Sequence, residues 1–366
     1  MMKKIIVFLN AYSQGISGAD KICIETWKHL DEKHITVMTS PEGKKMCDNF
    51  GLKARFVITT SEQVFQNPIQ TYLKRIIFGI WNAITSSQQD ILYSSSDQLP
   101  DILPALIFKL RNRNAQWIVR SYHTIPNKRP VSHHAQKLSW LLIKTLAATI
   151  ITASTLMERK LIQHGFSSKN MYIVYPGISE PRIMRKKTIY KYDAVFMSRL
   201  HSSKGIFDLI SIWKNVTKKL PNATLAIIGV GEKQTIQKLN HTIKINNLQN
   251  SIKLLGHQSD EKAQEIISRS QMFVFPSHEE GFSLTIAEVL LIGTPIIAYD
   301  LQIYQDVFPN ALSLIPRSDI NAFADQIIEV MSNRKKYDKK VNFGKSVAQK
   351  YTWKKSLENE RAILHL

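Results

Sequence analysis

Residues 272–300 read MFVFPSHEEGFSLTIAEVLLIGTPIIAYD and divide into an apolar strand, a polar loop, a helix and a second apolar strand. The helix begins near Ser283 and stops at Gly293, where glycine favours a left-handed cap and a proline soon follows. The loop places Glu280 and Gly281 beside the free N–H groups of the helix N-terminus. Because open α/β sheets bind phosphates and sugar hydroxyls at such loops, we expect a binding site here.

The same alternation of strand and helix runs through most of the chain, with one interruption. A polar, proline-bearing stretch at residues 179–187 has no periodicity and is the best linker candidate. The sequence therefore predicts two α/β domains, residues 1–178 and 187–350, each Rossmann-like and facing the other across a cleft. Strands are expected at residues 5–9, 35–39, 55–58, 90–97, 117–124, 147–153, 192–197, 223–228 and 252–255. Helices are expected at residues 19–30, 72–84, 103–110, 207–219, 233–245 and 260–270, the last capped by Asp260.

The chain of 366 residues carries 49 Lys and Arg against 29 Asp and Glu, a net charge of +20. Such an excess favours anionic partners, namely nucleic acid, acidic lipid or phosphorylated substrates. Two cysteines, Cys23 and Cys47, without metal-ligand spacing indicate a reducing cytoplasm and no structural zinc. The apolar run that starts at Ile5 is too short for a signal peptide, and no apolar stretch approaches the roughly 20 residues of a spanning helix. We expect a soluble cytoplasmic protein, free or bound to the inner face of a membrane.

The apolar helix expected at residues 72–84 has two interpretations. Five aliphatic residues repeat at helical spacing, which favours a core helix: Leu73, Ile76, Ile77, Ile80 and Ile84. The alternative is an interfacial helix, with Lys74 and Arg75 on anionic lipid and the aromatic residues in the headgroup layer.

Two features of the N-terminal domain fall at strand exits. Gly15, Ser17 and Gly18 lie between the first strand and its helix, where either an anion site or a plain turn is expected. His123 ends the strand at residues 117–124, where a histidine is either structural or part of the site.

At this point the chain resembles glycosyltransferase family 4, whose members have the two-domain GT-B fold and retain the donor's anomeric configuration. Four segments carry the resemblance, and it covers nearly the whole chain. They are Arg199-x-x-x-x-Lys204-Gly205, Glu280-x7-Glu288, the Gly15–Gly18 loop and Tyr351-Thr352-Trp353 before a final helix. The last segment implies that residues 351–366 cross back onto the N-terminal domain, which would bind the acceptor while the C-terminal domain binds the donor.

The resemblance also implies roles for individual residues. Glu280 would hold the donor sugar's hydroxyls and Glu288 the ribose hydroxyls, while His123 would orient the donor sugar or the acceptor hydroxyl. Arg199 and Lys204 would stabilise the charge that builds on the departing diphosphate. The remaining donor-binding candidates are Gly15, Ser17, Gly18, Gly281, Phe282, Ser283 and Leu284. The candidates expected to lie against the nucleotide are Gly229, Gly256, His257 and Gln258.

The implied partners are a UDP-, GDP- or ADP-sugar and a glycan or lipid-linked acceptor from bacterial cell-surface polysaccharide, lipopolysaccharide or glycolipid synthesis, with an anionic membrane surface nearby. The chain lacks the Asp-x-Asp motif that binds a divalent metal beside a nucleotide sugar, so we expect no metal and no cofactor. Two alternatives remain open. One is a basic nucleic-acid-binding protein, against which the dispersed charge and missing motifs argue. The other is a GT-B-fold sugar-nucleotide epimerase or phosphorylase.

Overall fold

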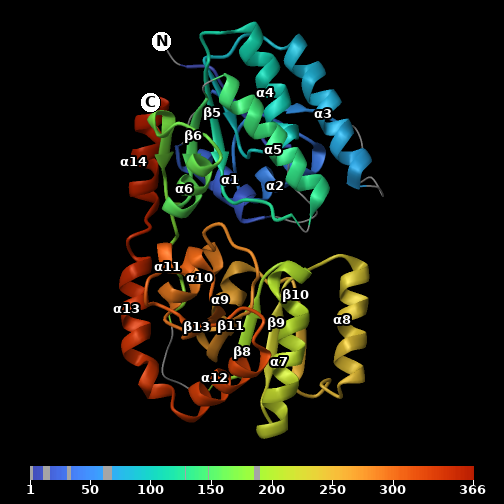
Figure 1. The fold of residues 1–366 in the computed structure, drawn as a ribbon, viewed down its shortest axis with the longest axis vertical. Helices are drawn as coiled ribbons and strands as arrows, with labels where there is room; N and C mark the ends of the chain where they lie inside the picture. Colours follow the sequence, from blue (N-terminus) through green and yellow to red (C-terminus); the bar gives the residue numbers. More distant parts are fainter. Residues whose placement is uncertain are drawn as a thin grey trace. The chain divides into compact units, whose positions relative to one another are not determined.

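The computed structural model describes residues 3–10, 17–30, 34–60, 68–127, 129–146, 148–184 and 190–366. The chain divides into two compact units, each built on a parallel sheet with helices around it (Figure 1). The N-terminal unit comprises Met1–Gly177 and Trp353–Leu366, and the C-terminal unit comprises Ile178–Thr352. In the described residues no helix has both the length and the apolar character needed to cross a bilayer.

The N-terminal unit contains a seven-stranded sheet in the order β3-β2-β1-β4-β5-β6-β7. Its strands are β1 (Ile5–Phe8), β2 (Ile35–Thr39), β3 (Arg55–Ile58), β4 (Ile91–Ser94), β5 (Gln116–Ser121), β6 (Thr149–Thr152) and β7 (Met171–Ile173). Its helices are α1 (Gly18–Leu30), α2 (Pro41–Asn49), α3 (Pro68–Thr85), α4 (Leu99–Arg111), α5 (Pro130–Thr145), α6 (Thr155–Gln163), the 3-10 turn η1 (Ser168–Asn170) and α14 (Trp353–Leu364).

Alternate residues of β1 supply two separate cores, because successive strand side chains point to opposite faces of a sheet. Ile5 and Val7 pack in the core shared with α1, α2 and α14. Ile6 and Phe8 pack in the core shared with α3, α4, α5 and α6. The sheet is therefore buried on both faces, which accounts for its nearly continuous apolar strands.

Helix α14 belongs to the N-terminal unit although it ends the chain, and Figure 1 shows it in red against the blue and green elements. Glu360 of α14 is fully buried, forms an ion pair with Arg120 of β5 and accepts a 2.7 Å hydrogen bond from Tyr93. Trp353 stacks on His29 at 4.6 Å between ring centroids. The predicted return of the C-terminal helix to the N-terminal domain is confirmed, and it starts at residue 353 rather than 351.

The C-terminal unit contains a six-stranded parallel sheet in the order β10-β9-β8-β11-β12-β13. Its strands are β8 (Tyr192–Met197), β9 (Leu225–Ile228), β10 (Ile252–Gly256), β11 (Ser270–Phe275), β12 (Ile296–Tyr299) and β13 (Ser313–Ile315). Its helices and 3-10 turns are η2 (Ser202–Lys204), α7 (Ile206–Lys219), α8 (Lys233–Ile245), α9 (Asp260–Ser268), α10 (Leu284–Ile292), α11 (Gln302–Val307), α12 (Ile320–Ser332), η3 (Arg334–Tyr337) and α13 (Asp338–Ala348). Two Rossmann-like units, as predicted, make up the fold.

Three details of the prediction are wrong. Helix α9 is capped by Ser259, whose hydroxyl accepts from the Lys262 N–H, and not by Asp260, which is the first helical residue. Helix α4 begins four residues before the predicted start, because Pro100 occupies its first turn, where a missing N–H costs nothing. In α3 only Ile76 of the predicted aliphatic repeat is buried, whereas Leu73, Ile77 and Ile84 are exposed, so most of the repeat does not face the core.

Candidate active site

The sheet of the C-terminal unit changes direction between β8 and β11. The two strands are neighbours, yet β9 and β10 follow on one side and β12 and β13 on the other. Helix α7, which follows β8, packs beside α8 and α12, whereas α10, which follows β11, packs beside α9 and α13. The helices that follow β8 and β11 therefore belong to different helix layers, and ligands of open α/β sheets bind at such switch points.

The loops that follow β8 and β11 contact each other through their backbones. Gly205 caps α7 with a left-handed φ of 70°, and a Cβ there would lie 1.7 Å from the carbonyl oxygen of Pro276. The His278 N–H donates to the carbonyl of Ser203 at 2.9 Å. Only glycine satisfies both the backbone angle and the close approach at residue 205. This contact explains the glycine after Lys204 without invoking a ligand.

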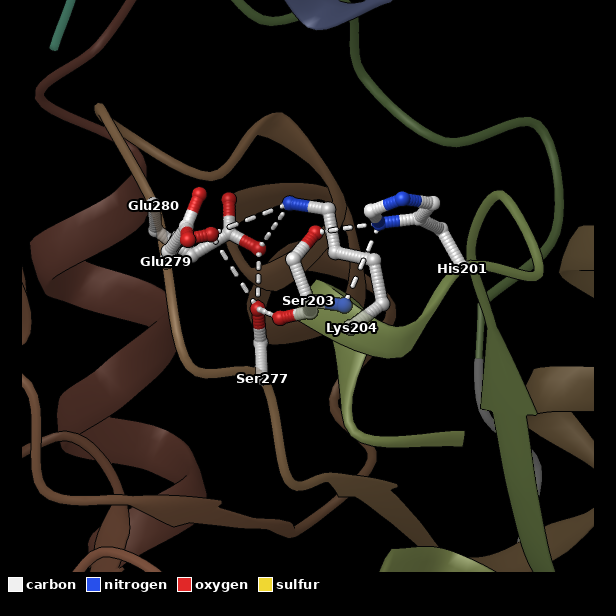
Figure 2. A network of polar contacts seen from close by, with 6 residues as sticks. All are labelled: His201, Ser203, Lys204, Ser277, Glu279 and Glu280. Carbon is white, nitrogen blue, oxygen red and sulfur yellow. Dashed lines mark hydrogen bonds and ion pairs between the residues drawn. The ribbon is translucent and has the colours of Figure 1, made fainter. Parts of the chain in front are cut away.

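Lys204 and Glu280 meet at this junction (Figure 2). Lys204 Nζ lies 2.6 Å from Glu280 Oε1 and 3.1 Å from the carbonyl oxygen of Glu279, and the two charged side chains are 19% and 8% exposed. The buried Ser277 hydroxyl lies 2.9 Å from the same Glu280 oxygen. Two residues 76 positions apart in sequence, which the motifs singled out separately, thus form one charged pair.

The start of α10 holds its backbone in an unusual conformation. Ser283 has φ 74° and ψ 76°, and its side chain is buried. A non-glycine residue in the left-handed region is strained by roughly 1–2 kcal/mol, and such strain clusters at ligand sites. The preceding Phe282 is anchored by edge contacts to Phe308 at 5.6 Å and Tyr351 at 5.1 Å. The loop from Gly281 to Leu284 is therefore fixed by packing on its inner side.

Glu288 is the only charged residue of α10, and its side chain is half-buried. Its neighbours Ala287 and Val289 are fully buried. A carboxylate among buried apolar residues is retained where it is paired or where it serves a ligand. This placement agrees with a binding role for Glu288.

The sequence analysis missed a hydrogen-bonded group beside Glu280. Asp208 of α7 accepts from the Tyr299 hydroxyl at 2.8 Å and lies 3.2 Å from His278 Nε2. The hydrogen bond from His278 lowers the pKa of Asp208. Because His278 precedes Glu279 and Glu280, the group connects α7 and β12 to the loop that carries the carboxylate. Its members lie 70 and 91 residues from Asp208, so no local spacing could have revealed it.

The nucleotide candidates lie at the neighbouring strand exits. Gly229 has φ 142°, and a Cβ there would lie 1.8 Å from the carbonyl oxygen of Ser198, so packing of the β9 exit on the β8 exit requires glycine. Gly256 ends β10 and accepts the Gly229 N–H at 2.9 Å, while His257 is exposed and Gln258 donates to the Leu255 carbonyl at 2.6 Å. Arg199 follows β8 with a half-buried side chain.

In the N-terminal unit the sheet changes direction between β1 and β4. Ser17 precedes α1 there and caps it, because its hydroxyl accepts from the Asp20 N–H at 3.2 Å and donates to Asp20 Oδ2 at 2.7 Å. Gly18 is the first residue of α1, and Gly15 lies outside the described residues. His123 is exposed, and its carbonyl accepts from Gln136 at 2.9 Å.

Two buried carboxylates that the sequence analysis did not select lie at the β4 exit. Asp101 accepts from the Asn10 N–H at 2.6 Å and from the Ser96 hydroxyl at 2.6 Å, and burial raises its pKa to about 7. Burial also raises the pKa of Asp97, which accepts from Trp140. Their hydrogen bonds fix the loop after β4 and Asn10, which follows β1.

Comparison with known proteins decides the family of the C-terminal unit. The family model for glycosyl transferases group 1 matches residues 179–347. The C-terminal unit is a group 1 glycosyl transferase domain. The predicted resemblance to glycosyltransferases is thereby confirmed at the level of group 1.

Two curated relatives extend the similarity of this group 1 domain. A glycosyltransferase of uncharacterised function from Methanocaldococcus jannaschii is 32% identical over 251 residues, 62% of this chain and 59% of the relative. The poly(glycerol-phosphate) alpha-glucosyltransferase of Bacillus subtilis is 25% identical over 262 residues, 69% of this chain and 38% of that protein. The chain thus spans between about two fifths and three fifths of the length of these relatives.

The fold matches solved structures along the whole chain. Anabaena HepE, solved in complex with UDP and glucose, superposes with a TM-score of 0.77 over 99% of both chains at 16% identity. At that identity the similarity shows the fold, and the predicted GT-B class of two Rossmann-like units with a returning C-terminal helix is confirmed.

Proposed function

We propose that this protein is a glycosyltransferase that moves a sugar from a nucleotide-diphosphate sugar to a hydroxyl group, with retention of the anomeric configuration. The observation that carries the proposal is the Lys204–Glu280 pair between the loops of β8 and β11, in a domain of the group 1 family. The UDP complexes of structurally similar proteins make UDP-sugars the first donors to test.

The chemistry requires a cation that strengthens its hold as the sugar–phosphate bond breaks. Lys204 carries a point charge with three donors, and Arg199, five residues earlier, adds a second positive charge on the same loop. The free N–H groups at the start of α10 supply fixed donors for the diphosphate. These groups suit charge stabilisation by the protein itself, so the proposed reaction uses no metal and no cofactor.

Glu280 has a separate proposed role from Glu288. The Glu280 carboxylate, held by Lys204 and Ser277, would accept hydrogen bonds from the donor sugar's hydroxyls. Glu288, two helical turns further, would accept from the ribose hydroxyls. We propose that the leaving phosphate takes the acceptor's proton in a front-face substitution, and that His123 of the N-terminal unit orients the donor sugar or the acceptor hydroxyl.

The proposed acceptor is a glycan or a lipid-linked precursor of a cell-surface polymer, met at the cytoplasmic face of an anionic membrane. The similarity to a poly(glycerol-phosphate) alpha-glucosyltransferase supports a polymeric acceptor. An epimerase remains the second candidate, because it would use the same donor-binding groups. Nucleic-acid binding is disfavoured by the group 1 domain.

The test is transfer from radiolabelled UDP-, GDP- and ADP-sugars to bacterial glycan and lipid-linked acceptors. Glu280→Ala and Lys204→Ala should each reduce kcat/KM by about a hundredfold or more, since loss of one group aligned on developing charge costs roughly that much. Lys262→Ala is the matched control, because Lys262 forms an ion pair of the same 2.6 Å length with Glu265 on the surface of α9.

Thermal unfolding must show that all three variants remain folded. Normal turnover in either site variant would reject the site assignment. Conversion of the donor to its epimer without any acceptor would favour the epimerase, and an inverted anomeric centre in the product would reject retention.

A further inference from the structure

The outward side of α3 is apolar, which is the reverse of what a helix on a protein surface normally presents. The exposed side chains repeat at intervals of three to four residues along the helix: Ile69, Leu73, Ile77, Phe78, Trp81 and Ile84. We refer to these six residues as the α3 face. Trp81 is 65% exposed and Ile77 61% exposed, so most of each side chain is in contact with solvent. A contiguous apolar stripe of this kind marks an interaction surface.

The inner side of α3 is firmly packed, so the helix cannot rotate to bury the stripe. Ile76 and Ala83 are buried, and Ala83 is part of the core under α4 and α5. A Cβ on Gly79 would lie 2.6 Å from Pro104 of α4, which shows how closely the two helices approach. Arg111 of α4 also donates to the Ala83 carbonyl at 2.5 Å. The exposure of the α3 face is therefore built into the fold.

The charges around the α3 face are almost all positive. No acidic residue occurs from position 68 to position 89, and none occurs in α5. Between these segments Asp97 and Asp101 are buried and Asp90 is exposed. Arg111 is exposed on α4, which packs beside α3, and Lys137 and Lys144 are exposed on α5, which packs beside α4.

Helix α5 adds apolar surface to the same helical layer. Val131, Leu138 and Leu141 are each at least half exposed and alternate along the helix with Lys137 and Lys144. Interspersed aliphatic and basic side chains are typical of helices that lie in a membrane interface.

We propose that the α3 face, with the basic residues of α4 and α5, docks this protein on an anionic lipid bilayer. The aliphatic residues and Phe78 would enter the boundary between headgroups and acyl chains, and Trp81 would sit at headgroup level, where tryptophan is enriched. The basic residues would be attracted by the negative surface potential. A bilayer fits better than a second copy of the chain, because two copies would bring the same positive charges together. The inference does not depend on the transfer reaction.

Sedimentation with vesicles tests the proposal in the absence of any nucleotide sugar. The probes are vesicles of phosphatidylcholine alone and of phosphatidylcholine with about one third phosphatidylglycerol. We expect the chain to bind the anionic vesicles at least about tenfold more tightly than the neutral ones and to lose binding at high salt. Ile77→Ser/Trp81→Ser should weaken anionic binding at least about tenfold, because it removes the two most exposed side chains of the α3 face. Lys137→Gln should weaken it about fivefold, the effect of one charge near the surface.

The matched control is Ile245→Ser/Phe343→Ser, which removes exposed apolar side chains, 62% and 47% exposed, from the C-terminal unit. It should bind as the unchanged chain does. Failure to bind either vesicle, equal binding to both, or equal loss in the control would overturn the proposal. If light scattering instead finds a dimer that Ile77→Ser/Trp81→Ser converts to a monomer without vesicle binding, the α3 face is a contact between copies and the proposal is wrong. Transfer to a soluble acceptor should persist in these variants, which separates this outcome from failure of the proposed reaction.

Discussion

The ion pair between Arg120 and Glu360 should contribute more to the stability of the N-terminal unit than any exposed pair. Glu360→Gln keeps the size of the side chain but removes its charge, leaving the Arg120 guanidinium, 1% exposed, without a compensating carboxylate. Removing one partner of a buried pair typically costs about 3–5 kcal/mol. For a domain of this size that corresponds to a fall in Tm of roughly 6–20 °C.

Tryptophan fluorescence during urea or thermal unfolding is the appropriate measurement, because five of the six tryptophans belong to the N-terminal unit. The control is Asp48→Asn, which breaks the 2.6 Å pair with Lys44 on α2 of the same unit. Both members of that pair are more than 40% exposed, so its loss should cost less than about 1 kcal/mol.

A second variant tests whether the loss of stability comes from the uncompensated charge or from a weaker attachment of α14. Arg120→Met/Glu360→Leu replaces the pair by apolar side chains and should recover much of the stability that Glu360→Gln loses, since apolar replacement of buried pairs is often neutral. A decrease for Glu360→Gln no larger than for Asp48→Asn would refute the reasoning. So would a double variant that is less stable than the single one.

Two further predictions concern strain and titration. Ser283→Gly should raise the unfolding free energy of the C-terminal unit by about 1 kcal/mol, because it relieves the left-handed backbone at a modest cost in chain entropy. A decrease in denaturation experiments would contradict the assignment of strain. Burial raises the pKa of Asp101 to about 7, above its unfolded value of about 3.9, so the folded chain holds the extra proton between these values and loses stability as pH rises through them. Between pH 4 and pH 8 the unfolding free energy of Asp101→Asn should therefore rise by up to about 4 kcal/mol relative to that of the unchanged chain. If the difference between the two unfolding free energies does not vary with pH, the carboxyl is already ionised at low pH and the prediction is wrong.

Local patterns predicted most of the C-terminal unit correctly. The strand at residues 192–197 and the helix at 233–245 have the predicted bounds, and α10 ends at Gly293 with the expected left-handed cap, φ 89°. These elements depend on short-range signals, namely apolar runs, turn residues and caps, that the sequence displays directly.

Predictions that depended on which side a helix buries were less successful. Helix α3 carries apolar residues at helical spacing on more than one of its sides. The periodicity of the sequence therefore could not distinguish the side that faces α4 from the side that faces solvent. The close contact of Gly79 with Pro104 selects the buried side, and that contact joins two helices. Of the two interpretations of residues 72–84, the core helix describes the side that carries Ile76 and Ala83, and the interfacial helix stays a prediction for the exposed side.

The sequence by itself determined the two-domain alternation, the loop before α10 and the residue types of the site, because each is encoded within one strand–loop–helix segment. The tertiary structure alone decided that Lys204 and Glu280 pair, that Gly205 and Gly229 serve backbone packing, and that Asp208 and Tyr299 support His278. These contacts join segments roughly 30 to 90 residues apart. They form only when the parallel sheet brings β8, β9, β11 and β12 together, and that order is a property of the assembled sheet rather than of any one segment.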